Sequence, residues 1–144
     1  MGCSLNAEQE ASLNRAVNQH LSAMNDGRTL QFISEIHPSA VKYYKSKGDD
    51  LFKKHFTLID SSEVYEPDYY QDPLIKTIES KGERLHVRYE VLKIENIDGN
   101  TESVPYYMYA TSEDNGKSWY FLEEGDYFNN DIIPAKERLI EKNK

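Results

Sequence analysis

The side chains that could do chemistry here are four histidines, one cysteine and 25 acidic residues. The histidines stand at positions 20, 37, 55 and 86. No two of them have the close spacing typical of metal ligands, so we predict no metal site and no cofactor. The chain also has no glycine-rich phosphate loop and no Gly-x-Ser-x-Gly nucleophile turn. Because these motifs are absent, we predict no catalytic residue.

One short motif spans residues 112–119, with the pattern S-x-D-x-G-x-S-W. It matches the Asp-box, a structural turn that repeats in the blades of sialidases and related propellers. A single copy in 144 residues predicts a turn and no glycosidase. The same loop fails as a calcium-binding EF-hand, because Thr111 and Leu122 stand where that loop needs Asp and Glu.

The only cysteine, Cys3, follows Met1 and Gly2 and precedes Ser4. This junction resembles the cut end of a bacterial lipoprotein, in which Cys3 would carry the lipid and hold the protein at the cell envelope. It also resembles the start of dually acylated proteins, although Asn6 stands where myristoylation needs Ser or Thr. The third alternative is an unmodified start in a cytoplasmic protein. We expect membrane contact only through a lipid on Cys3.

Composition limits the classes of partner. The net charge of −8 argues against a nucleic-acid partner, because a phosphate backbone attracts basic surfaces. No apolar run approaches the roughly 18 residues of a membrane span. The length predicts a single domain over residues 7–144 after a flexible start at residues 1–6.

Two glycine-centred turns predict an antiparallel meander of three strands. Asn115-Gly116 and Asp98-Gly99 both suit a type I′ turn, in which both central residues have positive φ. The resulting register pairs Met108 with Tyr89, Ala110 with Phe121, and Ser112 with Trp119. One sheet face then carries Leu85, Val87, Tyr89, Val91, Val104, Tyr106, Met108, Ala110, Trp119 and Phe121.

Helices are predicted mainly before this meander. The first is Ala7–Asn25, whose apolar stripe includes His20. The others are expected at residues 29–36 with Leu30, Ile33 and Ile36 inward, at 40–47 capped by Ser39, at 51–56, and at 132–142. The acidic, tyrosine-rich residues 59–72 are expected to be irregular, with an edge strand in part of them, before a strand at 74–80.

The order of these features resembles the nuclear-transport-factor-2-like superfamily, also called the cystatin-fold cone, and especially its small bacterial lipoprotein-type members. The resemblance rests on the long first helix, on residues 36–41 (I-H-P-S-A-V) and 47–51 (K-G-D-D-L), and on G-x-x-W-x-F at 116–121. It covers residues 7–124. It implies an α+β fold, with N-terminal helices packed on a curved antiparallel sheet; a short C-terminal helix lies outside that core.

The resemblance also implies a conical cavity between helices and sheet. The residues expected to line it, and to hold a small apolar or aromatic ligand, are His20, Tyr89, Tyr106, Met108 and Trp119. The alternative is a cavity filled by these side chains. On the opposite sheet face the family pairs into homodimers, and the interface candidates are His86, Arg88, Tyr107, Tyr109, Tyr120 and Leu122.

Function is predicted only as a class: a non-catalytic domain that binds a small ligand or another protein. The alternative is a small lyase or isomerase of the ketosteroid-isomerase-like or polyketide-cyclase-like type, which needs a carboxylate base in the cavity. The predicted inward face carries no acid, since Glu90, Glu102 and Glu124 fall outward or at edges. Only residues 59–72 are left to supply one, through Asp60, Glu63 or Asp72.

Overall fold

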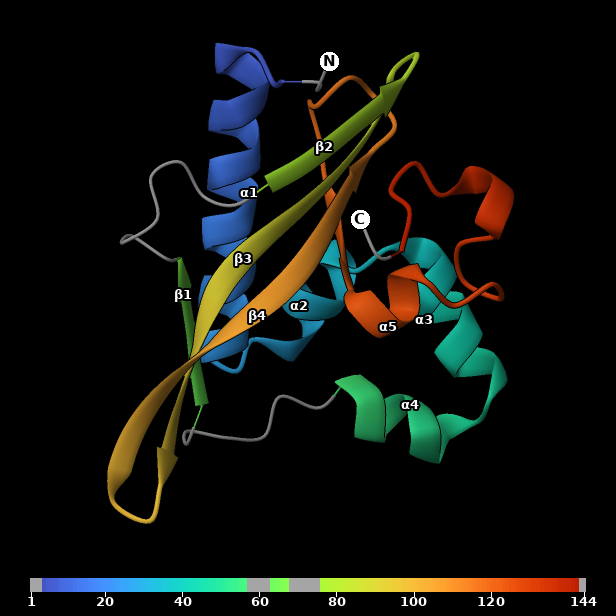
Figure 1. Cartoon of the computed structure of the whole chain (residues 1–144). Helices are drawn as coiled ribbons and strands as arrows, with labels where there is room; N and C mark the ends of the chain where they lie inside the picture. Colours follow the sequence, from blue (N-terminus) through green and yellow to red (C-terminus); the bar gives the residue numbers. More distant parts are fainter. Residues whose placement is uncertain (1–3, 57–62, 68–75, 143–144) are drawn as a thin grey trace.

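The computed structural model describes residues 4–56, 63–67 and 76–142, and has an α+β fold (Figure 1). The helices are α1 (Ala7–Asn25), α2 (Thr29–Glu35), α3 (Pro38–Ser46), α4 (Asp49–Phe56), α5 (Glu124–Tyr127) and the 3-10 helix η1 (Ala135–Glu137). The strands are β1 (Glu63–Pro67), β2 (Lys76–Lys81), β3 (Arg84–Ile97), β4 (Asn100–Ser112) and β5 (Tyr120–Glu123). The predicted class, with helices first, a curved antiparallel sheet next and a short C-terminal helix, is confirmed. Among the described residues, no helix has the length and apolar character needed to cross a membrane.

The sheet has the strand order β1-β3-β4-β5. Strand β2 also pairs with β3, along residues 84–89, whereas β1 pairs with residues 91–95. The predicted register is confirmed: Tyr89 pairs with Met108, and Ala110 pairs with Phe121. Both turns have the expected left-handed backbone, with φ of 51° at Asp98 and 62° at Asn115. The ladder between β4 and β5 ends earlier than predicted, at Thr111 and Tyr120.

The predicted inward sheet face packs against α1. With Leu13, Val17 and Leu21 of that helix it forms one buried cluster, which includes Leu85, Val87, Tyr89, Val91, Met108, Ala110, Trp119 and Phe121. Val104 is the exception, because 41% of it is exposed. Its part of the β3–β4 hairpin extends away from α1 toward the hairpin tip, where no helix covers it (Figure 1).

The opposite sheet face is also covered, which corrects the predicted dimer interface. Tyr109 and Leu122 are buried in a second cluster with Phe32 of α2, Tyr127 of α5 and Ile140. His86 is buried as well, whereas Arg88 and Tyr107 are half-buried and Tyr120 is 38% exposed. Dimerisation itself stays a prediction, but three of its six residues already pack inside their own chain.

The C-terminal segment provides much of this cover, and it is not the helix predicted over residues 132–142. Only Ala135–Glu137 forms a helical turn there. The reason is that side chains take up the backbone groups: Leu139 N donates to His86 Nδ1 at 3.3 Å, and Ile140 N donates to Tyr127 Oη at 3.0 Å. Residues 138–140 therefore follow an irregular, bent path, held by two buried side chains.

The N-terminal helices differ from prediction in their caps and faces. Asn6 caps α1 through a capping box with Gln9, so the ordered chain begins before Ala7. In α2, Leu30 is 86% exposed and Phe32 is buried instead, stacked 5.0 Å from His20. The cap of α3 is His37, whose Nδ1 accepts a hydrogen bond from Ser39 N.

The Asp-box loop before β5 is held by its own side chains. Asp114 accepts hydrogen bonds from Ser118 Oγ, Ser118 N and Lys117 N, and the Ser118 bonds contribute most to lowering the pKa of Asp114 to about 2. Ser112 Oγ accepts from Gly116 N at 2.8 Å. These bonds replace the ladder beyond Thr111 and confirm the structural role predicted for the motif.

The same loop docks on α1. Gln9 Nε2 donates to Asn115 O at 3.1 Å, and Trp119 Nε1 donates to Ser12 Oγ at 3.2 Å. Gly116 also lies close to the helix: a Cβ on it would stand 2.8 Å from Gln9 Cγ and 3.3 Å from Leu85 Cδ1.

We expect Gly116→Ala to lower the free energy of unfolding by about 1–3 kcal/mol, measured by urea denaturation. The backbone φ of +86° disfavours alanine, and the methyl group would have to displace Gln9. The control is Gly125→Ala in α5, where φ is ordinary and no atom lies within 4 Å. That change is expected to alter stability by less than about 0.5 kcal/mol. Equal effects of the two substitutions would contradict the close packing at Gly116.

Candidate functional site

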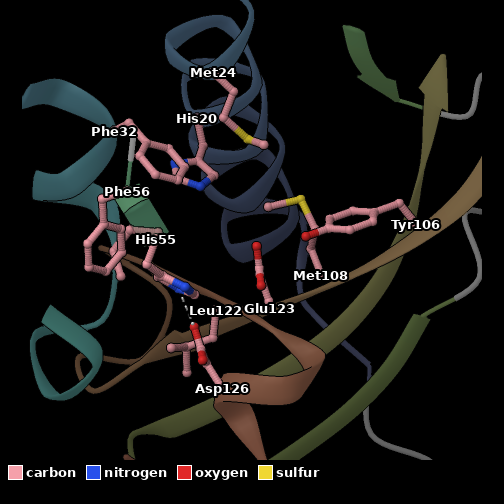
Figure 2. A pocket seen from close by; sticks show the side chains of 11 residues that line it. His20, Met24, Phe32, His55, Phe56, Tyr106, Met108, Leu122, Glu123 and Asp126 are labelled. Atoms are coloured by element: carbon pink, nitrogen blue, oxygen red, sulfur yellow. Dashed lines mark hydrogen bonds and ion pairs between the residues drawn. The ribbon is translucent and has the colours of Figure 1, made fainter. Parts of the chain in front are cut away.

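A hollow lies between the helices α1, α2 and α4 and the end of the sheet at β5 and α5 (Figure 2). Its cavity volume is about 30 Å³, and the empty space around it is about 380 Å³ when the part open to solvent is included. The lining residues are His20, Met24, Phe32, Ile36, His55, Phe56, Tyr106, Met108, Leu122, Glu123 and Asp126.

Three of the five predicted pocket residues line this hollow: His20, Tyr106 and Met108. Tyr89 does not, because it is buried in the α1 cluster, where its hydroxyl lies 3.7 Å from Met108 Sδ. Trp119 lines a different, open groove of about 290 Å³ beside α1. The predicted set therefore splits between the hollow, the core and a surface groove.

His20 forms one wall of the hollow and is held on three sides. Its ring stacks on Phe121 at 4.4 Å and on Phe32 at 5.0 Å, and its Nδ1 lies 2.9 Å from Glu35 Oε1. The ring is fully buried, whereas Glu35 is partly exposed. This geometry fits a hydrogen-bonded core histidine whose orientation is fixed.

The opposite wall is built by His55 and Asp126. His55 Nε2 lies 3.2 Å from Asp126 Oδ2, and the other oxygen, Asp126 Oδ1, accepts a hydrogen bond from Tyr44 Oη at 2.5 Å. Tyr44 also stacks on the His55 ring, with centroids 3.7 Å apart and 15° between planes. Burial and the bond to Asp126 raise the pKa of Tyr44 above its usual range, so this hydroxyl remains the proton donor.

Glu123 brings a second carboxylate to the same place. It stands at the N-cap of α5 and Asp126 three residues later, so the two side chains lie one helical turn apart, on the same side of the helix. His55 Nε2 or Nδ1 and an oxygen from each acid all lie within 4.8 Å of one another. Within the described part of the chain, no Lys or Arg lines the hollow.

This group was missed in the sequence because it joins distant segments. The spacing of the four histidines predicts no metal site, and the sequence of residues 124–127 does not predict a helix. The Glu123-x-x-Asp126 spacing was the available local signal. Nothing local indicated that α4 would carry His55 to it.

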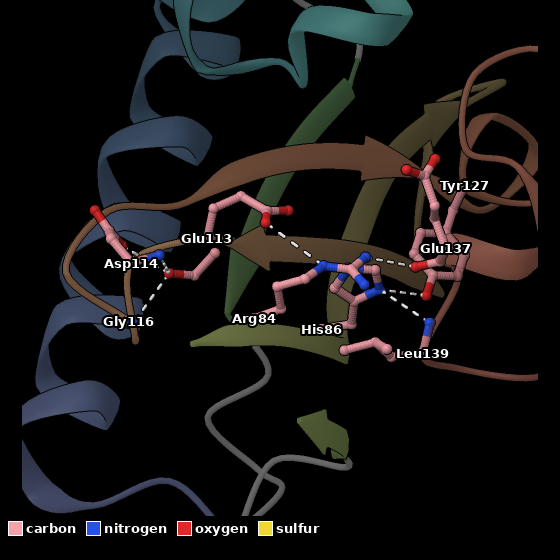
Figure 3. A network of polar contacts seen from close by, with 9 residues as sticks. Arg84, His86, Glu113, Asp114, Gly116, Tyr127, Glu137 and Leu139 are labelled. Carbon is pink, nitrogen blue, oxygen red and sulfur yellow. Dashed lines mark hydrogen bonds and ion pairs between the residues drawn. The ribbon is translucent and has the colours of Figure 1, made fainter. Parts of the chain in front are cut away.

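The other buried histidine, His86, lies in a polar network away from the hollow (Figure 3). Its Nδ1 lies 2.6 Å from Tyr127 Oη, and Arg84, two residues earlier, donates to Glu137 O at 2.6 Å. Burial lowers the pKa of His86 to about 4, and the Arg84 charge adds to this effect. Because its Nδ1 is bonded to both Tyr127 Oη and Leu139 N, His86 has a structural role.

Cys3 and residues 68–75 lie outside the described part of the chain, as do Asp60 and Asp72. The lipid-anchor prediction and the possibility of an acid from this segment therefore stay predictions. Comparisons with protein-family models, curated proteins and solved structures found no match.

Proposed function

We propose that this chain is a non-catalytic binding domain of the nuclear-transport-factor-2-like type, which holds a small, positively charged ligand in the hollow beside His55. The observation that carries the proposal is the charge of that site. Glu123 and Asp126 meet there, and none of the described residues that line the hollow is Lys or Arg. Because Asp126 is only 6% exposed, water screens its charge poorly and a cationic group gains most by approaching it.

The remaining walls favour a ligand with an apolar body. Met24, Phe32, Phe56 and Leu122 are among the residues that line the hollow around the acids. Apolar walls with a few oriented polar groups are typical of small-molecule sites. A ligand with an aromatic ring and a cationic group would match both the apolar walls and the two carboxylates.

The alternative function, a lyase or isomerase, is supported by one observation: a buried acid lies against a tyrosine and a histidine, as such a base would. A general base must, however, offer a lone pair to the substrate. Both Asp126 oxygens already have neighbours, Tyr44 Oη at 2.5 Å and His55 Nε2 at 3.2 Å. Glu123 is exposed and has no such support. Binding is therefore the better-supported proposal.

The test is an NMR titration of ¹⁵N-labelled protein with benzamidine, a flat aromatic cation, and with benzamide, its neutral counterpart. We expect millimolar benzamidine to shift the amides of His55, Leu122 and Asp126, and benzamide to shift them much less. Glu123→Gln is expected to weaken benzamidine binding several-fold, because it removes one charge from the hollow. Glu124→Gln removes an exposed carboxylate that does not line the hollow, and serves as the matched control.

Equal shifts with the two probes, or shifts confined to residues away from the hollow, would contradict binding by charge at this site. Loss of binding in Glu124→Gln as large as in Glu123→Gln would mean that overall charge, and not the hollow, attracts the probe.

A further inference from the structure

We propose that the hollow binds a divalent transition-metal cation through His55 Nε2, Asp126 Oδ2 and a Glu123 carboxylate oxygen. This inference rests on the proposed function, since it names the cation that the same negative site selects. The three donors come from α4, from the N-cap of α5 and from α5 itself. They are an imidazole nitrogen and two carboxylate oxygens, all of which bind zinc and its neighbours in the first transition series.

The distances suit simultaneous coordination. Donors bound at about 2.0–2.2 Å to one tetrahedral or octahedral ion lie about 3.0–3.4 Å apart. His55 Nε2 and Asp126 Oδ2 already stand 3.2 Å apart. All three donors lie within 4.8 Å, and Glu123, being exposed, is free to rotate the remaining distance.

Tyr44 orients both of the less mobile ligands. Its hydroxyl binds Asp126 Oδ1, which leaves Oδ2 facing His55, and its ring stacks on the imidazole. Metal ligands are commonly held this way by a partner that does not touch the ion, and losing such a partner weakens metal binding about 10–100-fold. On binding, Nε2 must present its lone pair, so any proton there moves to Nδ1 or to solvent.

The chemistry of the three donors narrows the choice of metal ion. Calcium prefers six to eight oxygen donors, and magnesium keeps most of its water, so neither matches a set that includes an imidazole. A three-ligand site with a position left for water is typical of zinc, cobalt and manganese.

The experiment is a titration of the tag-free Cys3→Ser chain with Co²⁺, followed by its visible d–d absorption, and then with Zn²⁺ in competition. Removing the thiol excludes it as a ligand. We expect saturation at one ion per chain, displacement of Co²⁺ by Zn²⁺, and a rise in the melting temperature with Zn²⁺.

Variants locate the ion. Glu123→Gln is expected to raise the Kd for Co²⁺ at least about 10-fold, and Tyr44→Phe to raise it by a comparable factor without removing a ligand. Glu124→Gln, its exposed neighbour, is expected to change the Kd by less than about twofold. His55→Gln is expected to abolish the absorption change. Circular dichroism of each variant establishes that it is folded.

The outcomes separate this inference from the proposed function. No Co²⁺ absorption, with benzamidine shifts intact, overturns the metal site and leaves a site for organic cations. If the protein binds neither Co²⁺ nor benzamidine, both the metal site and the proposed function are overturned. Co²⁺ binding that is equally weakened by Glu123→Gln and Glu124→Gln, or unaffected by His55→Gln, places the ion elsewhere and overturns the assignment.

Discussion

Replacing Phe121 with alanine is expected to lower the free energy of unfolding by about 3–5 kcal/mol, the usual range for a buried phenylalanine. Phe121 is buried where α1 meets the sheet. Its ring stacks on His20 at 4.4 Å and meets Tyr89 edge-on at 6.4 Å. Alanine would leave a cavity on that side of His20 and remove one of the two rings that orient it.

The measurement is urea denaturation, with Tyr120→Ala as the control on the same strand. Tyr120 is 38% exposed, and its loss is expected to change stability by about 0.5 kcal/mol or less. The free energy of unfolding of a typical domain is about 5–15 kcal/mol, so Phe121→Ala is expected to remove a large part of it. A loss below about 1 kcal/mol would mean that the ring does not fill the core as described.

Acidification is expected to destabilise the protein through His86. Its pKa is about 4 when folded, against an ordinary value of 6.5, because the site is buried and Arg84 lies beside it. Between these two values the unfolded chain binds more protons than the folded one, so the free energy of unfolding falls as the pH is lowered through this range. The loss from His86 amounts to about 2 kcal/mol between pH 7 and pH 5, and about 3 kcal/mol below pH 4.

The test compares urea denaturation at pH 7 and pH 5 for the native chain and for His86→Asn, which cannot be protonated in this range. We expect the pH-dependent loss to be smaller in the variant by about 2 kcal/mol. Some loss remains in the variant, because burial also lowers the pKa of His37. An identical pH dependence in both proteins would show that His86 is not buried in its neutral form.

The parts of the fold that could be predicted are those with local causes. Asp98-Gly99 and Asn115-Gly116 each require positive φ at adjacent residues, and that requirement fixed the register of three strands. The stripe on residues 7–25 likewise placed α1 against the correct sheet face. Each of these signals lies within a few residues of the structure it produces.

The rest depended on contacts between distant segments. The sequence predicts an interface at Tyr109 and Leu122, because that sheet face is too apolar to meet only water and the family resemblance implies homodimers. These two residues are instead covered within their own chain, by side chains from α2, α3, α4, α5 and residues 132–140. That last segment is mostly non-helical because His86 and Tyr127 bind its backbone, a cause that helix propensity cannot reveal. The candidate site was missed for the same reason, since α4 and α5 meet only in the folded chain.

In the last part of strand β4, alternate residues pack into two different buried clusters. Met108 and Ala110 face α1, whereas Tyr109 packs on Tyr127, so residues 108–112 have no solvent side at all. Residues 100–105 of the same strand are exposed throughout. Among descendants of a common ancestor, sequence drift is therefore expected to be rapid in the first half of this strand. In residues 108–112, which are buried on both faces of the sheet, we expect only substitutions that keep the side-chain volume.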